Sequence, residues 1–173
     1  MYLELRPHAV RLLLLVLLQV LVLRQIIPGD GWLRHGEVIL YPLFIMMLPL
    51  RWHLAFIIMS AFFCGLLTDL FYDTPGVHAA TSTLTAFLRP LVLQVISPRS
   101  GYDPKQQLTR STFGPRWFAF YAGTFLLMHI FFLQVFNVFT FYYFTEILWK
   151  TLLTWIMSFG VLMLQDLIFN PKQ

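Results

Sequence analysis

Long apolar segments constrain what this chain can fold into. A helix that crosses a bilayer needs about 20 mainly apolar residues. Five segments approach or reach that length, at residues 9–27, 54–72, 76–96, 116–138 and 145–169. The chain is 58% hydrophobic and 12% charged, whereas soluble domains carry about 25% charged residues. We therefore predict a single all-α polytopic membrane domain that takes up residues 1–173.

A sixth segment, residues 37–50, is shorter and contains Pro42 and Pro49. At about 1.5 Å per residue a helix of this length rises only about 20 Å. It must borrow residues from 31–36, thin the bilayer, or enter and leave on the same side. Proline is tolerated in a spanning helix where neighbouring helices satisfy the freed backbone groups. We expect a short span that is kinked at proline.

The basic residues favour six spans with both termini in the cytoplasm. On this topology eight of the twelve basic residues fall in cytoplasmic segments, and only Arg24 and Arg34 fall outside. Such a bias is typical of cytoplasmic loops. Without a span at 37–50, the basic N-terminus and the basic loop 97–115 would lie on opposite sides. The net charge of +4 is thus assigned to topology and to contacts with anionic lipid headgroups or a cytoplasmic partner, not to nucleic acid.

The segment 76–96 carries a polar stripe. Its members recur at helical spacing and fall within about 100° of one another on one face. Lipid would reject such a face, so we expect it to meet other helices, a wet cavity or a partner. The stripe consists of His78, Thr81, Ser82, Thr85 and Arg89.

Asp69 lies about one turn inside the outer end of the segment 54–72. An ionised carboxylate is costly in hydrocarbon, so it needs donors. The chain turns at Pro75-Gly76, which brings the start of the next helix alongside, and the N-terminal amides of a helix bind anions. We predict a clamp between Asp69 and the region of His78 and Thr81. Behind Asp69, the small residues Ala61 and Gly65 permit close approach of another helix.

The remaining intramembrane charges are Arg89 and Asp166. Arg89 either snorkels to the inner surface or pairs with Asp166 near the inner end of the last span. Glu146 and Lys150 stand at i and i+4 in the favourable order for an ion pair. The last span also has a weaker polar side, with Thr151, Thr154, Ser158 and Gln165.

Signals for catalysis or metal binding are absent from the sequence. The chain has no HExxH, no GxSxG and no glycine-rich phosphate loop. Asp69 and Asp73 are spaced as a carboxylate pair, but no third ligand follows at helical spacing. Cys64 is the single cysteine, and we interpret His129 as a hydrogen-bonded structural residue. We expect no enzyme activity, no cofactor and no metal.

A kinked second span ending MMLPLR is followed by a hairpin that reads GLLTDLFYDTPGVHA. This layout resembles MreD, the family of rod shape-determining membrane proteins of bacteria. The family's characteristic stretch is a G-L-x-x-D-L run, a short turn with glycine and a helix rich in small residues. The motif covers about residues 47–88. Its positions are occupied by Gly65, Leu66, Asp69, Leu70, Gly76 and Ala79.

The resemblance implies a non-enzymatic, multi-pass scaffold in the bacterial inner membrane. Such a scaffold belongs to the elongasome, supports peptidoglycan synthesis and cell shape, and binds MreC. Through MreC it would be linked to a class B penicillin-binding protein, RodA and MreB. We expect the two helices of the hairpin to form or brace a groove for a helix of the partner. The residues assigned to this architecture are Gly65, Asp69, Gly76, His78, Thr81, Ser82 and Thr85.

The family also resembles, in its six-helix fold, the substrate-binding S components of energy-coupling-factor vitamin transporters. This supplies an alternative function, in which Asp69, His78 and Thr81 would line an outward cavity for a small molecule. S components often carry small residues at every fourth position of the first helix. Here that helix reads AVRLLLLVLLQVLVL and is bulky after Ala9, which counts against a transporter. A lipid-binding or flippase-like role is a third alternative.

Overall fold

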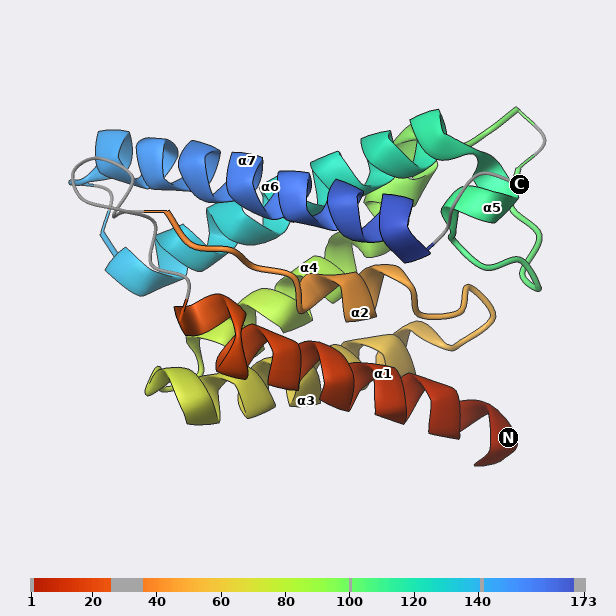
Figure 1. Ribbon diagram of the computed structural model, residues 1–173, viewed down its shortest axis with the longest axis horizontal. Coiled ribbons are helices and arrows are strands. Elements are labelled where there is room, and N and C mark those ends of the chain that lie inside the picture. Colours follow the sequence, from red (N-terminus) through yellow and green to blue (C-terminus); the bar gives the residue numbers. More distant parts are fainter. Residues whose placement is uncertain (1, 26–35, 100, 141, 170–173) are drawn as a thin grey trace.

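The computed structural model describes residues 2–25, 36–99, 101–140 and 142–169 of the chain (Figure 1). These residues form helices joined by short turns and loops, and they contain no strand. The elements are α1 (Tyr2–Leu21), the 3-10 turn η1 (Leu23–Gln25), α2 (Pro42–Met46), α3 (Leu54–Tyr72), α4 (Val77–Val95), α5 (Arg110–Phe113), α6 (Pro115–Val138) and α7 (Phe144–Phe169).

The helices pack as two antiparallel hairpins joined through α4. α3 packs against α4, α6 packs against α7, and α4 packs against α6, while α1 lies against α3. Figure 1 shows the start of α1 and the end of α7 toward the same end of the molecule. The most buried large side chains include Tyr41, Tyr121 and Phe125, each at 0% exposure. The core therefore lies where α2, α4 and α6 meet.

Four helical segments among the described residues are long and apolar enough to cross a membrane. They are Pro7–Gln25, Leu54–Tyr72, Pro115–Val138 and Phe144–Asp166. Their outward side chains are apolar and exposed, for example Leu21 at 65% and Phe120 at 70%, as expected of surfaces that face lipid. The predicted all-helical membrane character is confirmed. α4 has a comparable length, but the polar stripe lowers its hydropathy.

The segment 37–50 departs from the predicted kinked span. Only Pro42–Met46 is helical, and residues 36–40 run extended between α1 and α7 (Figure 1). The residues from Val38 through Met46 are all buried. Irregular backbone at membrane depth is tolerated where protein surrounds it. The prediction of one short helix was therefore wrong in its secondary structure.

Side chains of α1 and α7 satisfy the extended backbone. The Ile39 amide donates to Ser158 Oγ at 2.8 Å, and the Glu37 amide donates to Thr154 Oγ1 at 3.3 Å. Gln19 accepts from the Leu40 amide at 2.8 Å and donates to the Val38 carbonyl at 2.8 Å. The polar side of the last span thus substitutes for the hydrogen bonds that a neighbouring strand would make.

Candidate functional site: a braced helical hairpin

The turn between α3 and α4 is built from two left-handed residues. Asp73 has φ 55° and ends α3, and Gly76 has φ 84° and precedes α4. Aspartate visits this region more readily than most residues, and glycine adopts it without a Cβ penalty. The Gly76 amide donates to the Thr74 carbonyl at 2.8 Å. This tight turn places the first amides of α4 beside the last turns of α3.

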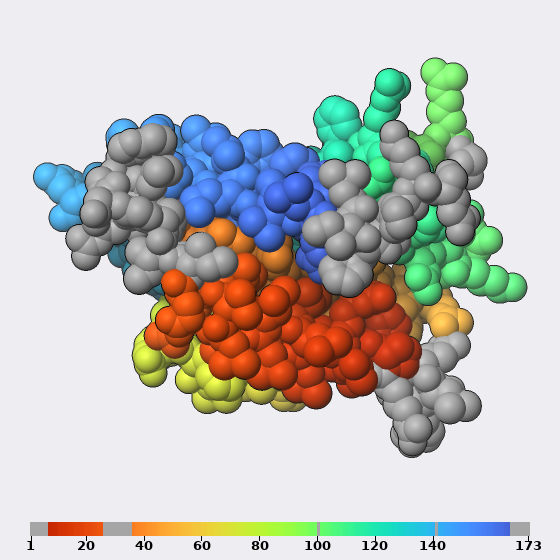
Figure 2. All heavy atoms as spheres, viewed as in Figure 1, coloured from red at the N-terminus to blue at the C-terminus, as the bar shows by residue number. Residues whose placement is uncertain are grey.

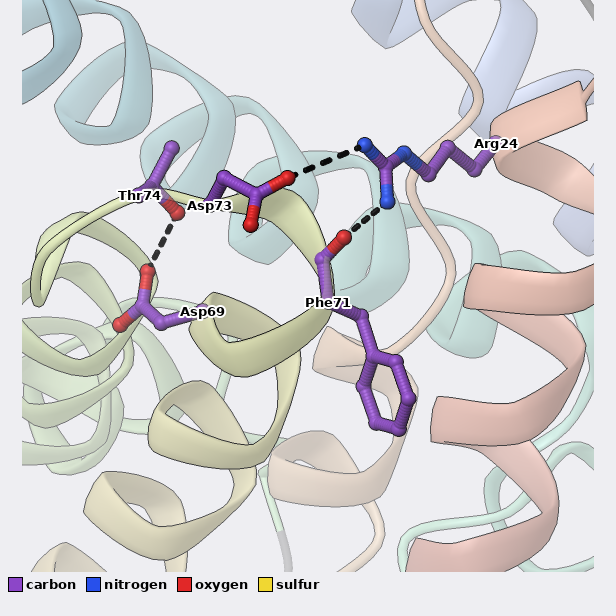
Figure 3. A network of polar contacts seen from close by, with 5 residues as sticks. All are labelled: Arg24, Asp69, Phe71, Asp73 and Thr74. Atoms are coloured by element: carbon purple, nitrogen blue, oxygen red, sulfur yellow. Dashed lines mark hydrogen bonds and ion pairs between the residues drawn. The ribbon is translucent and has the colours of Figure 1, made fainter.

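The Asp69 carboxylate binds the start of α4. Its Oδ1 accepts from Thr74 Oγ1 at 2.7 Å (Figure 3). Oδ1 also accepts from the His78 amide at 2.9 Å, and Oδ2 accepts from the Ala79 amide at 2.9 Å. The first amides of a helix have no partner within the helix, and its N-terminus favours negative charge. At 5% exposure, Asp69 therefore acts as a bracket between the two helices.

This bracket differs in detail from the predicted clamp. The backbone of His78 is used, but its imidazole points to another partner. The Thr81 hydroxyl donates to the Val77 carbonyl at 2.8 Å within α4. Thr74, in the turn, supplies the side-chain donor instead. Thr74 can reach the carboxylate because it follows Asp69 by only five residues and lies in the turn between the two helices.

Gly65 allows α3 and α4 to touch through their backbones. A Cβ at Gly65 would lie 2.6 Å from the Ala79 amide nitrogen and 2.6 Å from the Ala79 Cα, and would also meet the His78 carbonyl. Such approaches are too short for any side chain. One turn earlier, Ala61 is fully buried. The small residues of α3 therefore determine how closely the α3 and α4 backbones approach each other. This contact lies inside the hairpin, beneath its outer surface.

Arg24, in the turn η1 that follows α1, contacts the same end of the hairpin. It donates to the Phe71 carbonyl in the last turn of α3, and its guanidinium lies 3.8 Å from the Asp73 carboxylate (Figure 3). It also lies 5.1 Å from the centre of the Tyr72 ring. The final carbonyls of a helix lack partners within the helix and favour cations. This contact of Arg24 could not be predicted from the sequence, because Arg24 and the turn are far apart along the chain.

Behind the hairpin, a chain of buried hydrogen bonds crosses the core. Tyr41 Oη lies 3.0 Å from His78 Nδ1 and 2.7 Å from His129 Nε2. His129 Nδ1 in turn lies 3.0 Å from Thr85 Oγ1. All four side chains are buried. Three elements, α4, α6 and the segment before α2, are thereby joined, and His129 has the structural hydrogen bonds expected of it.

Two members of this core were not recognisable as site residues in the sequence. Tyr41 stands in the segment that lacks helical periodicity, so no face could be assigned to it. Gln19 is the single polar residue in a run of leucine and valine in α1. A lone polar residue in such a run indicates that its side chain makes hydrogen bonds within the protein. Gln19 donates to Tyr72 Oη at 2.9 Å in addition to its contacts with the extended segment.

Arg89 stabilises the end of α2 and does not pair with Asp166. Its Nη2 donates to the Met46 carbonyl at 3.1 Å and also to the Leu48 carbonyl, and its Nε donates to Tyr121 Oη at 3.1 Å. Tyr121 donates to the same Met46 carbonyl at 3.0 Å. Arg89 is 2% exposed, so its side chain does not snorkel to the surface. A cation is favoured at a helix C-terminus.

Asp166 pairs with a cation at the start of α5. Its Oδ2 accepts from Arg110 Nη1 at 2.9 Å, with the two side chains 9% and 12% exposed. The predicted alternative of an Arg89–Asp166 pair was therefore wrong, because each charge has a nearer partner. The expected Glu146–Lys150 pair is confirmed at 2.8 Å.

The outer side of the α3–α4 hairpin is hollowed into a groove. Its volume is about 660 Å³ and its walls are mainly apolar. Large side chains line it on the α3 side, and small ones line the first half of α4. We call this the hairpin groove; it is lined by Ile58, Phe62, Leu66, Gly76, Ala79, Ala80, Thr83, Leu84 and Phe87.

The hydrogen bonds and ion pairs described above join helices and segments to one another. The described residues contain no cluster of three His, Cys, Asp or Glu side chains that could hold a metal ion. Of the stripe on α4, only the Ser82 hydroxyl is buried without a hydrogen bond among the described residues.

Comparisons of the chain with models of protein families, with curated proteins and with solved structures gave no match. The geometry and the hairpin motif therefore carry the functional argument.

Proposed function

We propose that this chain is an MreD-like, non-enzymatic scaffold of the bacterial inner membrane. In this proposal it crosses the membrane six times with both termini in the cytoplasm. It binds a transmembrane helix of MreC and so supports the elongation complex that synthesises peptidoglycan. The class B penicillin-binding protein, RodA and MreB would be reached through MreC.

The hairpin groove is the observation that carries this proposal. It lies on the hairpin whose sequence resembles the family, and it faces away from the bundle: Phe62 is 38% and Phe87 is 56% exposed. Gly76, Ala80 and Thr83 present little bulk along one wall. Surfaces of small residues let a second helix approach closely, and association in membranes depends on such packing. A single transmembrane helix of a partner can pack against this surface of small residues.

The hairpin is held in shape without the partner. Asp69 receives three donors, and Gly65 keeps the two backbones in contact. A surface that is already ordered loses less conformational entropy on binding. The polar residues assigned to partner binding, His78, Thr81 and Thr85, therefore support the groove from beneath and do not face it.

The transporter alternative requires Asp69, His78 and Thr81 to face a cavity. Instead, the Asp69 carboxylate is bound by α4 and the turn, His78 Nδ1 faces Tyr41, and the Thr81 hydroxyl is used within its helix. All three are buried. A substrate would have to break these hydrogen bonds, so the geometry favours the scaffold.

The test is capture of MreC by variants that fill the hairpin groove. Ala80→Trp and Thr83→Trp place an indole in the groove, and we expect each to reduce co-purification of MreC from detergent extracts. A loss of about tenfold corresponds to about 1.4 kcal/mol. Leu91→Trp is the matched control, because Leu91 is 56% exposed on the same helix and does not line the groove.

Unchanged capture by both groove variants, with normal insertion, would contradict the assignment of the groove. Equal loss in all three variants would point to a general defect of α4. If none of the proteins, including the unsubstituted chain, retains MreC, then the scaffold function itself fails. Thermal stabilisation by a vitamin-like small molecule would support the transporter alternative instead.

A further inference from the structure

A second cavity, separate from the hairpin groove, opens between α1 and α7. Its volume is about 610 Å³, within the range of about 300–1,000 Å³ typical of ligand pockets. The walls are mostly apolar and include Leu14, Leu15, Phe118 and Leu162. Figure 2 views the molecule from the side on which α1 and α7 lie next to one another. We call this the α1–α7 cavity.

One cation lines this apolar cavity. Arg11 lies one helical turn after Pro7, at the start of the apolar stretch of α1. Among the described residues its guanidinium makes no hydrogen bond and no ion pair, whereas Arg24, Arg89 and Arg110 all have such partners. The side chain is partly buried. A charge beside hydrocarbon is stabilised by a counter-ion.

The opposite wall provides an unused acceptor. Gln165 Oε1 is buried and has no hydrogen-bond donor among the described residues. Asp166 also lines the cavity, but its carboxylate is bound by Arg110 at 2.9 Å, so that pair carries no net charge. The polar end of the cavity thus combines a positive charge with a hydrogen-bond acceptor, and the rest is apolar.

We propose that the α1–α7 cavity binds an anionic phospholipid. One acyl chain lies along the apolar wall formed by Leu14, Phe118 and Leu162. The phosphate pairs with Arg11, and a hydroxyl of the headgroup donates to Gln165. Phosphatidylglycerol has both features, a single negative charge and a hydroxyl-bearing headgroup. Basic pockets between transmembrane helices bind anionic headgroups in this way. This inference does not depend on the proposed binding of MreC.

Native mass spectrometry of the purified full-length chain, in mixed detergent with equal phosphatidylglycerol and phosphatidylcholine, tests the site. We expect a preference for phosphatidylglycerol that Arg11→Gln reduces about fivefold, as for one basic residue that contacts an anionic lipid. Arg11→Lys keeps the charge and is expected to retain most of the preference. Arg99→Gln is the control, because Arg99 is exposed in the loop after α4 and lies outside the cavity.

A second variant examines the apolar part. Leu14 is 62% exposed on the rim, so Leu14→Trp can occupy the cavity without burying a larger side chain in the core. We expect it to reduce retention of both lipids alike. The proposal is overturned if Arg11→Gln leaves the preference unchanged, or if Arg99→Gln reduces it equally. It is also overturned if Leu14→Trp does not alter retention.

Discussion

The Asp69 carboxylate uses both oxygens on the first amides of α4, and Thr74 adds a third donor. Asp73, four residues later, is equally acidic, but its side chain is 90% exposed and lies 3.8 Å from Arg24. Exposed ion pairs contribute little, whereas a buried acceptor with several donors contributes much more. Asp69 and Asp73 have the same charged side chain, so a difference between their contributions to stability reports burial and hydrogen bonding, not charge alone.

Asp69→Asn is expected to lower the free energy of unfolding by about 1–3 kcal/mol, because an amide NH2 would face a backbone N–H in place of an acceptor. Asp73→Asn should change it by less than about 0.5 kcal/mol. Thermal unfolding in detergent, followed by loss of helical circular dichroism, measures both. Equal effects of the two substitutions would contradict the bracket.

Two glycines within helices give a second matched pair. A Cβ at Gly65 would lie 2.6 Å from the Ala79 amide nitrogen, whereas a Cβ at Gly160 would meet nothing within 4 Å. We expect Gly65→Ala to lower the free energy of unfolding by about 1–3 kcal/mol through overpacking. Gly160→Ala should be neutral or raise it by up to about 1 kcal/mol through helix propensity. The same unfolding measurement applies, and a tolerated Gly65→Ala would disprove the close backbone contact.

At the scale of elements, the extended segment 36–40 is held by side chains of helices that are distant in sequence. Ser158 accepts from the Ile39 amide, and Gln19 contacts the backbone of Val38 and Leu40. Such a segment has neither the internal hydrogen bonds of a helix nor the ladder of a sheet. Its position therefore depends on a few polar groups of α1 and α7.

Ser158→Ala is expected to lower the free energy of unfolding by about 1–3 kcal/mol, because the buried Ile39 amide loses its acceptor. Thr151→Val on the same helix is the comparison: the Thr151 hydroxyl is buried without a hydrogen bond among the described residues. That substitution should be neutral or stabilising. Hydrogen exchange of the Ile39 amide reports the loss locally. Protection that is unchanged in Ser158→Ala would show that another group holds the segment.

The sequence predicted those parts of the site that depend on neighbours along the chain. Pro75-Gly76 fixed a tight turn, so the start of α4 had to lie within reach of Asp69. The partners of Arg89 could not be predicted in this way, because the Met46 carbonyl becomes free only where α2 ends after five residues. The same holds for the extended segment, whose acceptor Ser158 is 119 residues away.

At the scale of the whole molecule, the two ends of the α3–α4 hairpin differ in their exposed charged residues. Arg99 and Lys105 lie in the loop between α4 and α6, and the turn with Asp73 joins the opposite ends of α3 and α4 (Figure 1). In the proposed topology the basic loop is cytoplasmic. The turn with Asp73 then lies outside.

Cysteine labelling tests this orientation. Asp73→Cys is expected to react with a membrane-impermeant maleimide in intact spheroplasts, whereas Lys105→Cys should react only after lysis. The unsubstituted chain is the control, because Cys64 is buried and should remain unlabelled. Reaction of both variants in intact spheroplasts would place the loop and the turn on one side of the membrane and contradict the six-span topology.

The hydrogen bonds around Tyr41 also determine which ring nitrogen carries the hydrogen in His78 and in His129. The Thr85 hydroxyl donates to the Thr81 carbonyl at 2.9 Å, so its oxygen accepts a hydrogen bond from His129 Nδ1–H. His129 Nε2 is then an acceptor for the Tyr41 hydroxyl, whose oxygen accepts from His78 Nδ1. The reverse order would leave an N–H of His78 without an acceptor among the described residues. Both imidazoles are therefore the Nδ1–H tautomer, and the chain of donors has one direction, from α4 through Tyr41 to α6 and back to α4.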